Sequence, residues 1–184
     1  MRWIALFRGV NVGGKHVLPM KELTSLLESL GCRNVRTYIQ SGNAVFDSPS
    51  RDRAKLARRI SETIAAKRGF EPRVLLVDFP HLERVIASNP FIEAESEPKS
   101  LHVGFLESEP KDADLEALDR LRTGRERFEI VGSAFYLHTP DGFGTSKLAA
   151  QAEKLLGVPM TARNWRTVLK VRDLARAETS HSIG

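Results

Sequence analysis

The pattern of apolar and polar positions divides the first half of the chain into segments that alternate between strand and helix periodicity. Segment 3–8 is almost continuously apolar and precedes a glycine, which is typical of a strand buried on both faces of its sheet. Apolar residues at steps of three and four predict one helix over 20–30 and another over 51–68. The other predicted elements are a tightly connected hairpin of strands over 34–40 and 43–47 and a strand over 73–78. The predicted order is therefore β-α-β-β-α-β.

The second half of the chain repeats this order without a convincing identity of residues. The predicted elements are a strand over 100–106, a helix over 111–122, a hairpin over 127–131 and 134–138, a helix over 145–156, a short edge strand over 160–163 and a closing helix over 164–176. The hairpin strand of each half can lie between the two strands of a βαβ unit. We therefore expect an α+β fold of two tandem ferredoxin-like halves with antiparallel sheets.

A segment rich in proline and glutamate separates the two halves. Residues 88–99 contain Pro90, Pro98 and three glutamates, which is typical of a linker. We place the boundary after residue 90, so that 1–90 form a βαββαβ half. Residues 91–184 then form a βαββα-like half that ends in a C-terminal helix.

The composition is that of an ordinary globular protein in a reducing compartment. Hydrophobic residues make up 41% of the 184 residues and charged residues 28%, so a core can form. The single cysteine, Cys32, excludes an internal disulfide and a multi-cysteine metal site. The first apolar run ends at Arg8 and is too short for a signal peptide or a membrane span. We expect a cytoplasmic protein without a membrane partner.

Positive charge is concentrated in the first half. Residues 1–90 contain 15 basic and 8 acidic side chains (net +7), 91–130 contain 6 and 11 (net −5), and 131–184 contain 7 and 4 (net +3). The total of +5 permits an anionic partner without requiring one. The distribution fits either solvated helix faces that differ in sign or a basic binding face in the first half.

The loop after the first strand contains a GxxxxGK string over 9–15, which in P-loop NTPases surrounds a phosphate. Here His16 replaces the magnesium-binding serine or threonine, and Pro19 delays the helix that should hold the phosphate. The predicted hairpin also inserts an antiparallel strand, whereas a P-loop fold needs a parallel sheet. We therefore do not expect an NTPase.

A simpler anion site at the same loop remains open. Two adjacent glycines can arrange backbone N–H groups into an anion-binding concavity, and basic side chains can add charge. In the expected fold the end of the first strand lies beside the start of the second hairpin strand, which brings two polar segments together. The alternative is a mobile glycine turn. The predicted ligand-binding residues here are Arg8, Asn11, Gly13, Gly14, Lys15, Gln40, Ser41 and Asn43.

Two segments of the second half also combine polar and basic residues. The glycine-rich loop 139–147 leads into a helix, so Ser146 can be a helix cap or, with Lys147, part of a binding site. Segment 163–167, which contains the predicted ligand-binding residues Arg163, Asn164 and Trp165, places two guanidinium groups beside an indole. This combination can contact phosphates and stack on bases. The alternative for Trp165 is a place in the core.

The sequence identifies no catalytic or metal-binding motif. The five histidines lack metal-ligand spacing, and no serine lies in a nucleophile-elbow string. We expect no metal and no cofactor, and we assign no catalytic residue.

The chain contains the strings ALFRGVNVGGK (5–15), TYIQSGN (37–43), SKL (146–148) and TARNW (161–165). Together they resemble the bacterial domain of unknown function 1697 family. They occur in the same order and extend over nearly the whole chain. The resemblance implies a two-part α+β fold and a bacterial cytoplasmic origin, and it implies no activity or cofactor. Ala162 departs from the family pattern, in which a second threonine is expected beside Thr161.

These features support two main hypotheses for function. The first is a non-catalytic binding module for an anionic ligand, either a nucleotide or a nucleic acid, held at the first glycine loop. The second is an enzyme that acts on a small phosphorylated metabolite in a cleft between the halves, with Lys15 and Lys147 facing each other. An assembly scaffold that uses the acidic segment 91–130 is a third possibility. The sequence leaves the oligomeric state open.

Overall fold

The computed structural model describes residues 1–39 and 42–177, which form two compact units. The first unit contains residues 1–83 together with the described residues from Lys170 onward. The second unit contains residues 84–169. The division falls within two helices, α3 (Phe79–Ala87) and α6 (Trp165–Arg176), so each of these helices contributes residues to both units.

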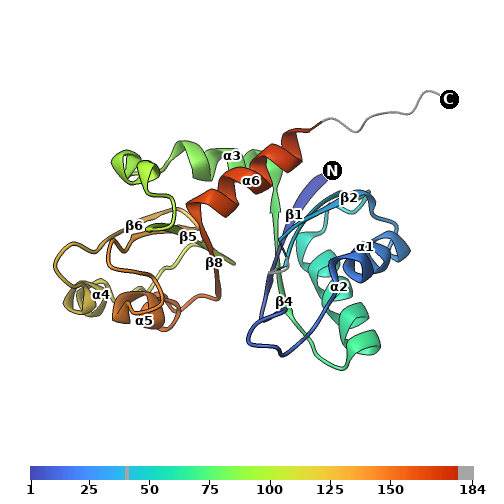
Figure 1. Cartoon of the computed structure of the whole chain (residues 1–184), viewed down its shortest axis with the longest axis horizontal. Helices are drawn as coiled ribbons and strands as arrows, with labels where there is room; N and C mark the ends of the chain where they lie inside the picture. Colours follow the sequence, from blue (N-terminus) through green and yellow to red (C-terminus); the bar gives the residue numbers. More distant parts are fainter. Residues whose placement is uncertain (40–41, 178–184) are drawn as a thin grey trace. The chain divides into compact units, whose positions relative to one another are not determined.

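The first unit contains a four-stranded antiparallel sheet with two helices on one face (Figure 1). Its strands are β1 (Arg2–Arg8), β2 (Arg33–Tyr38), β3 (Asn43–Asp47) and β4 (Arg73–Asp78), in the order β2-β3-β1-β4. The helices are α1 (Met20–Ser29) and α2 (Arg53–Arg68). The Asp52 side chain caps the N-terminus of α2 by accepting from the Lys55 N–H, and Gly69 ends the helix in a left-handed conformation.

The central strand β1 is buried on both faces. Trp3, Ala5 and Phe7 belong to the core that α1 and α2 cover. Ile4 and Leu6 alternate with them on the opposite face and are buried as well. Strand β1 also pairs with β3 on one side and with β4 on the other, so its backbone is hydrogen-bonded along both edges.

The second unit contains a sheet with the corresponding strand order. Its strands are β5 (Leu101–Leu106), β6 (Arg127–Val131), β7 (Ala134–His138) and β8 (Met160–Asn164), in the order β6-β7-β5-β8, all antiparallel. The helices α4 (Leu115–Leu121) and α5 (Lys147–Leu156) cover one face, and the short 3-10 helix η1 (Ile92–Ser96) precedes β5. The expected α+β class with antiparallel sheets is therefore confirmed.

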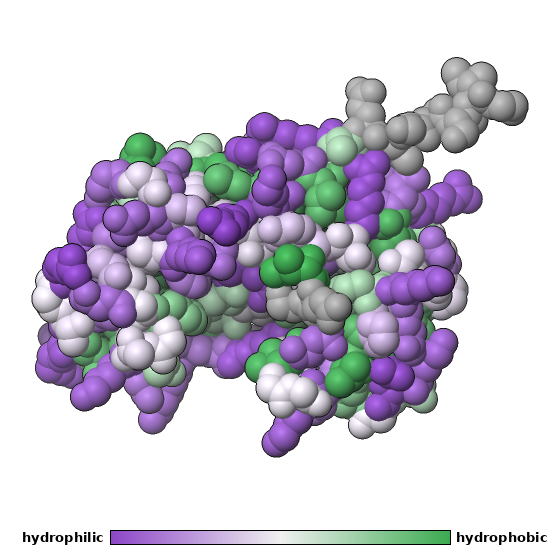
Figure 2. Space-filling view, in the orientation of Figure 1, coloured by the Kyte–Doolittle hydropathy of each residue, from purple (hydrophilic) through white to green (hydrophobic). Residues whose placement is uncertain are grey.

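Hydrophilic side chains dominate the face of the molecule shown in Figure 2. Two apolar side chains in the loop between β1 and α1, Val12 and Val17, are 63% and 52% exposed. Within the described residues, no helix combines the length and the apolar character needed to cross a membrane.

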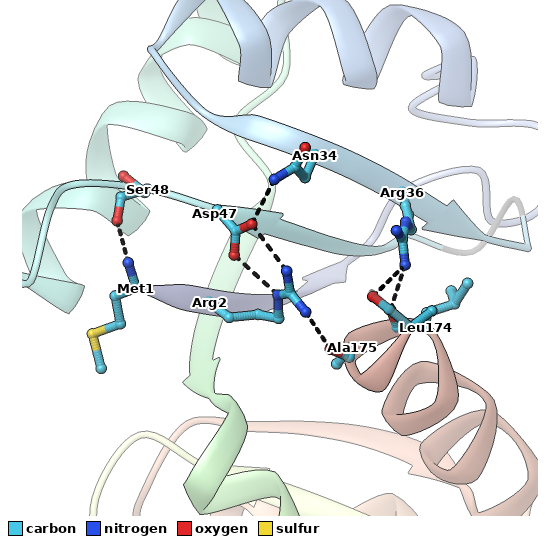
Figure 3. A network of polar contacts seen from close by, with 9 residues as sticks. Met1, Arg2, Asn34, Arg36, Asp47, Ser48, Leu174 and Ala175 are labelled. Atoms are coloured by element: carbon cyan, nitrogen blue, oxygen red, sulfur yellow. Dashed lines mark hydrogen bonds and ion pairs between the residues drawn. The ribbon is translucent and has the colours of Figure 1, made fainter. Parts of the chain in front are cut away.

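A network of arginine contacts holds the C-terminal end of α6 to the sheet of the first unit (Figure 3). Arg2 binds both carboxylate oxygens of Asp47, each at 3.0 Å, and donates a third hydrogen bond to the carbonyl of Ala175 at 2.7 Å. Arg36 donates to the carbonyls of Leu174 and Ala177. These carbonyls lack partners within the helix, so the two guanidinium groups satisfy the helix end and complement its negative dipole.

Replacing Asp47 by asparagine should destabilise the first unit by about 1–3 kcal/mol, because the substitution removes a charged, two-point partner of Arg2. Hydrogen bonds from Arg2 hold the pKa of Asp47 below its usual value, so the stability that this carboxylate contributes is present at neutral pH and is lost as the solution becomes strongly acidic. Urea unfolding at pH 7 measures the change.

Asp173→Asn is the matched control, since Asp173 pairs with Arg172 in an exposed position and such pairs contribute about 0–1 kcal/mol. Equal losses in the two variants would contradict a special role for the Arg2–Asp47 pair.

Candidate functional site

The glycine loop after β1 folds into a short β-hairpin over residues 11–16, which we call the glycine hairpin. The N–H of Lys15 donates to the carbonyl of Val12 at 3.0 Å, and the N–H of Asn11 donates to the carbonyl of His16 at 3.1 Å. Gly13 and Gly14 at the tip have φ of 58° and 72°, the left-handed values that a two-residue hairpin turn of the primed type requires. The GxxxxGK string thus forms a turn that is separated from α1, and does not open that helix directly.

Four side-chain contacts fix the glycine hairpin to the rest of the first unit. The Asn11 amide accepts from the N–H of Leu18 at 2.7 Å and donates to its carbonyl at 2.8 Å. The ring of His16 stacks on Phe70 and lies within hydrogen-bonding distance of the Gly9 carbonyl. Arg68 donates two hydrogen bonds to the carbonyl of Val17. The loop is therefore held in a defined conformation, and Asn11 contributes through both polar atoms of its side chain.

Basic residues from four segments lie at this end of the unit. Arg8 at the end of β1 and Arg73 at the start of β4 are directly paired in the strand register. Their neighbours Phe7 and Val74 belong to the core under α1 and α2, so both arginines lie on the opposite face of the sheet. Lys15 is on the glycine hairpin, and Arg68 lies at its base, where its guanidinium group also pairs with Glu22 at 3.5 Å. We call Arg8, Lys15, Arg68 and Arg73 the cationic end of the first unit.

Sequence reasoning found Arg8 and Lys15 but missed Arg68 and Arg73. The pairing of Arg73 with Arg8 depends on the register between β1 and β4, which no local pattern reveals. Arg68 is one of several basic residues on the same predicted helix, and the sequence does not distinguish it from side chains that only face solvent. The pairing matters because like charges directly opposite each other in a sheet are destabilising unless other groups offset them.

The predicted contribution of the β2–β3 hairpin is described in part. Gln40 and Ser41 lie outside the described residues. Asn43 is fully buried opposite Leu6, and its side-chain amide donates to the carbonyl of Tyr38 at 3.1 Å. The Gly42 carbonyl accepts from the N–H of Phe7 at 2.8 Å. The structure therefore brings this hairpin beside the end of β1, with the Asn43 amide bonded to the hairpin itself.

In the second unit, Ser146 is a helix cap, which was one of the two roles predicted for it from the sequence. Its hydroxyl caps α5 by accepting from the N–H of Ala149 at 3.1 Å. It also hydrogen-bonds the buried carboxylate of Glu126. Burial would raise the pKa of Glu126, but hydrogen bonds from Ser146 and from Thr123 outweigh it and hold the pKa below the usual value. The adjacent Lys147 is exposed and lines a groove between α4 and α5.

The segment Arg163–Trp165 lies at the junction of β8 and α6. The carbonyl oxygen of the Asn164 side chain accepts from the N–H of Thr167 and caps α6. Burial lowers the pKa of Arg163 to about 10, and its guanidinium group donates to the Ala162 carbonyl. Trp165 is only 1% exposed, so stacking of its indole on a base would require this region to open. Ligand contacts by these three residues stay a prediction.

A buried histidine that sequence reasoning missed lies next to this segment. His102 on β5 is the cross-strand neighbour of Asn164 and stacks on Phe143 with ring centroids 4.0 Å apart. Its Nδ1 is buried without a hydrogen-bond partner in the described part of the chain. Burial lowers the pKa of His102 to about 4, so the ring is neutral at physiological pH.

Because of His102, the free energy of unfolding should decrease as the pH falls from 7 toward 4. Below pH 6.5 the unfolded chain takes up a proton at this ring that the folded chain excludes, which costs about 2 kcal/mol at pH 5. Urea unfolding at pH 7 and pH 5 should therefore show a loss in the wild type that is larger, by about this amount, than the loss in His102→Leu. The same pH dependence in both proteins would show that His102 is not shielded from protons.

Comparison with known proteins identifies the family. A family model described as "Protein of unknown function (DUF1697)" matches residues 1–136. The chain belongs to this family. The resemblance seen in the sequence strings is thereby confirmed.

A solved structure shares the fold of this DUF1697 protein. The conserved bacterial protein SP0830 from Streptococcus pneumoniae superposes with a TM-score of 0.66 at 24% sequence identity, over 95% of this chain and 98% of that one. No curated protein matches the chain. The comparisons therefore establish the family and the fold, and the function has to be argued from the residues.

Proposed function

We propose that this DUF1697 protein is a non-catalytic binding module for an anionic ligand, the phosphate of a nucleotide or nucleic acid, held at the cationic end of the first unit. The observation that carries the proposal is the direct pairing of Arg8 with Arg73 beside the anchored glycine hairpin that bears Lys15. An anion between these groups could accept hydrogen bonds from both guanidinium groups.

The chemistry of the four side chains suits a phosphate. Arginine offers a planar set of N–H donors that can bind two phosphate oxygens at once, and lysine adds a compact positive charge. The glycine hairpin is held by Asn11 and Arg68, so Lys15 extends from an ordered turn. A preorganised site loses less conformational entropy when it binds a ligand.

The same residues favour binding over catalysis. His16 is the histidine nearest to the cationic end in sequence, and its ring is engaged by the Gly9 carbonyl and by Phe70. Arginine and lysine at this site can stabilise a bound charge, and a proton-transfer role would need a group that is close to a substrate and has a pKa near the working pH.

The exposed surface of α2 suggests how a nucleic acid could extend beyond this site. Arg51, which precedes α2, and Lys55, Arg58 and Arg59 on the helix are exposed, and within the described residues their side chains form no ion pair. Binding that uses these charges would be electrostatic and would weaken strongly with added salt, because each phosphate contact releases condensed counterions.

We further propose that both halves are ferredoxin-like and arose as a tandem repeat in a bacterial cytoplasmic protein. The corresponding strand orders β2-β3-β1-β4 and β6-β7-β5-β8 support this proposal.

Thermal unfolding in the presence of inorganic pyrophosphate, ATP and a short single-stranded oligonucleotide tests the proposed function. A ligand at 100 times its Kd stabilises the folded state by about 2.7 kcal/mol, which raises the Tm of the wild type. Lys15→Gln should reduce the rise or abolish it, because it removes one charge from the proposed site.

Lys111→Gln is the matched control, since it removes the same charge from an exposed position in the second unit. A loss in Lys15→Gln alone supports a site at the cationic end. Equal losses in both variants would indicate diffuse attraction to the basic surface, and no rise with any of the three ligands would contradict the proposal.

A further inference from the structure

The helices α4 and α5 of the second unit lie side by side (Figure 1). An open groove of about 480 Å³ lies between them. This volume is within the range of about 300–1,000 Å³ found for ligand pockets. Leu121 of α4 and Leu155 of α5 form the apolar part of its lining, and both pack against the core of the unit. Ala150 of α5 also lines the groove, is exposed, and leaves room there because its side chain is small.

Three cations form the rim of this groove. Lys147 and Lys154 are seven residues apart on α5 and therefore share one face of the helix, and Arg120 approaches from α4. Within the described residues, neither lysine side chain takes part in an ion pair or a hydrogen bond. The contact of Arg120 with Glu116 is long, at 3.5 Å, and highly exposed, so it contributes little.

We propose that this groove binds an acidic amphipathic helix of a partner protein. Apolar side chains on one face of such a helix would cover Leu121 and Leu155, while its carboxylates would meet Arg120, Lys147 and Lys154. This occupant fits better than a nucleic acid, because phosphates would gain nothing from the leucine surface. The inference goes beyond the anion-binding function, since it concerns a different unit and a different class of partner.

The charge and shape of the groove also explain why the partner should be helical. The ten residues of α5 extend over about 15 Å, which is the length of two to three turns of a bound helix. Apolar residues at steps of three and four would align with the groove, and glutamates at the flanking positions would reach its rim.

Fluorescence anisotropy with a dye-labelled probe peptide tests this proposal on the full-length protein. The probe has about 14 residues, with leucine at steps of three and four and glutamate at the other positions. We expect saturable binding that weakens at least about tenfold in the double variant Lys147→Glu/Lys154→Glu, because carboxylates would then oppose carboxylates. Ala150→Phe should weaken binding similarly without a change in charge, since the larger side chain would occupy the groove.

Lys111→Glu is the matched control, because Lys111 is exposed in the same unit and does not line the groove. Its affinity should stay within about twofold of the wild type. Thermal melts monitored by circular dichroism should show that all variants are folded.

Four results would overturn the proposal. The first is no saturable binding up to about 1 mM peptide. The second is an equal loss in Lys111→Glu, and the third is equal binding of a control peptide with lysine in place of glutamate. The fourth is displacement of the probe by a single-stranded oligonucleotide at a lower concentration than by unlabelled peptide, which would assign the groove to nucleic acid.

Discussion

The central position of β1 is the constraint on which the first unit depends. The strand is hydrogen-bonded to β3 and β4 along its two edges and buried on both faces. A shift by one position would therefore move Trp3, Ala5 and Phe7 out of the core under α1 and α2. This fixed register places Arg8 opposite Arg73 and directs the chain out of the sheet at Gly9. The glycine hairpin then returns the chain toward α1. The proposed anion site is therefore a consequence of how β1 is held.

The second unit uses the same sheet order for different chemistry. Strand β5 lies between β7 and β8, as β1 lies between β3 and β4. A Cβ atom at Gly104 in β5 would lie 2.3 Å from the sulfur of Met160, so a larger residue there would displace the Met160 side chain. Two lysines of α5 and Arg120 of α4 lie beside the half-buried Leu121 and Leu155, whereas the cationic end of the first unit is built on strand ends and a turn. We therefore propose different binding roles for two units that share one strand order.

Local pattern was sufficient to predict most of the secondary structure. The apolar run of β1, the two hairpins and the amphipathic helices are each encoded by nearby residues, and Ser146 was recognisable as a helix cap. The pairing of Arg8 with Arg73, the contact of Ser146 with Glu126 and the shielding of His102 by Phe143 depend on segments that are distant in sequence. The sequence left two alternatives for Trp165, because an indole beside arginines fits either a core position or a stacking surface. The structure shows that it is buried.

The most direct measurement of the central claim is a titration of ¹⁵N-labelled protein with inorganic pyrophosphate, followed by amide chemical shifts. If the cationic end binds phosphate, the largest saturable changes should occur at the amides of residues 9–15 and at Arg73, where β1 and β4 meet. Changes that are confined to the first turns of α2 or to the second unit would contradict the claim, as would the absence of any saturable change.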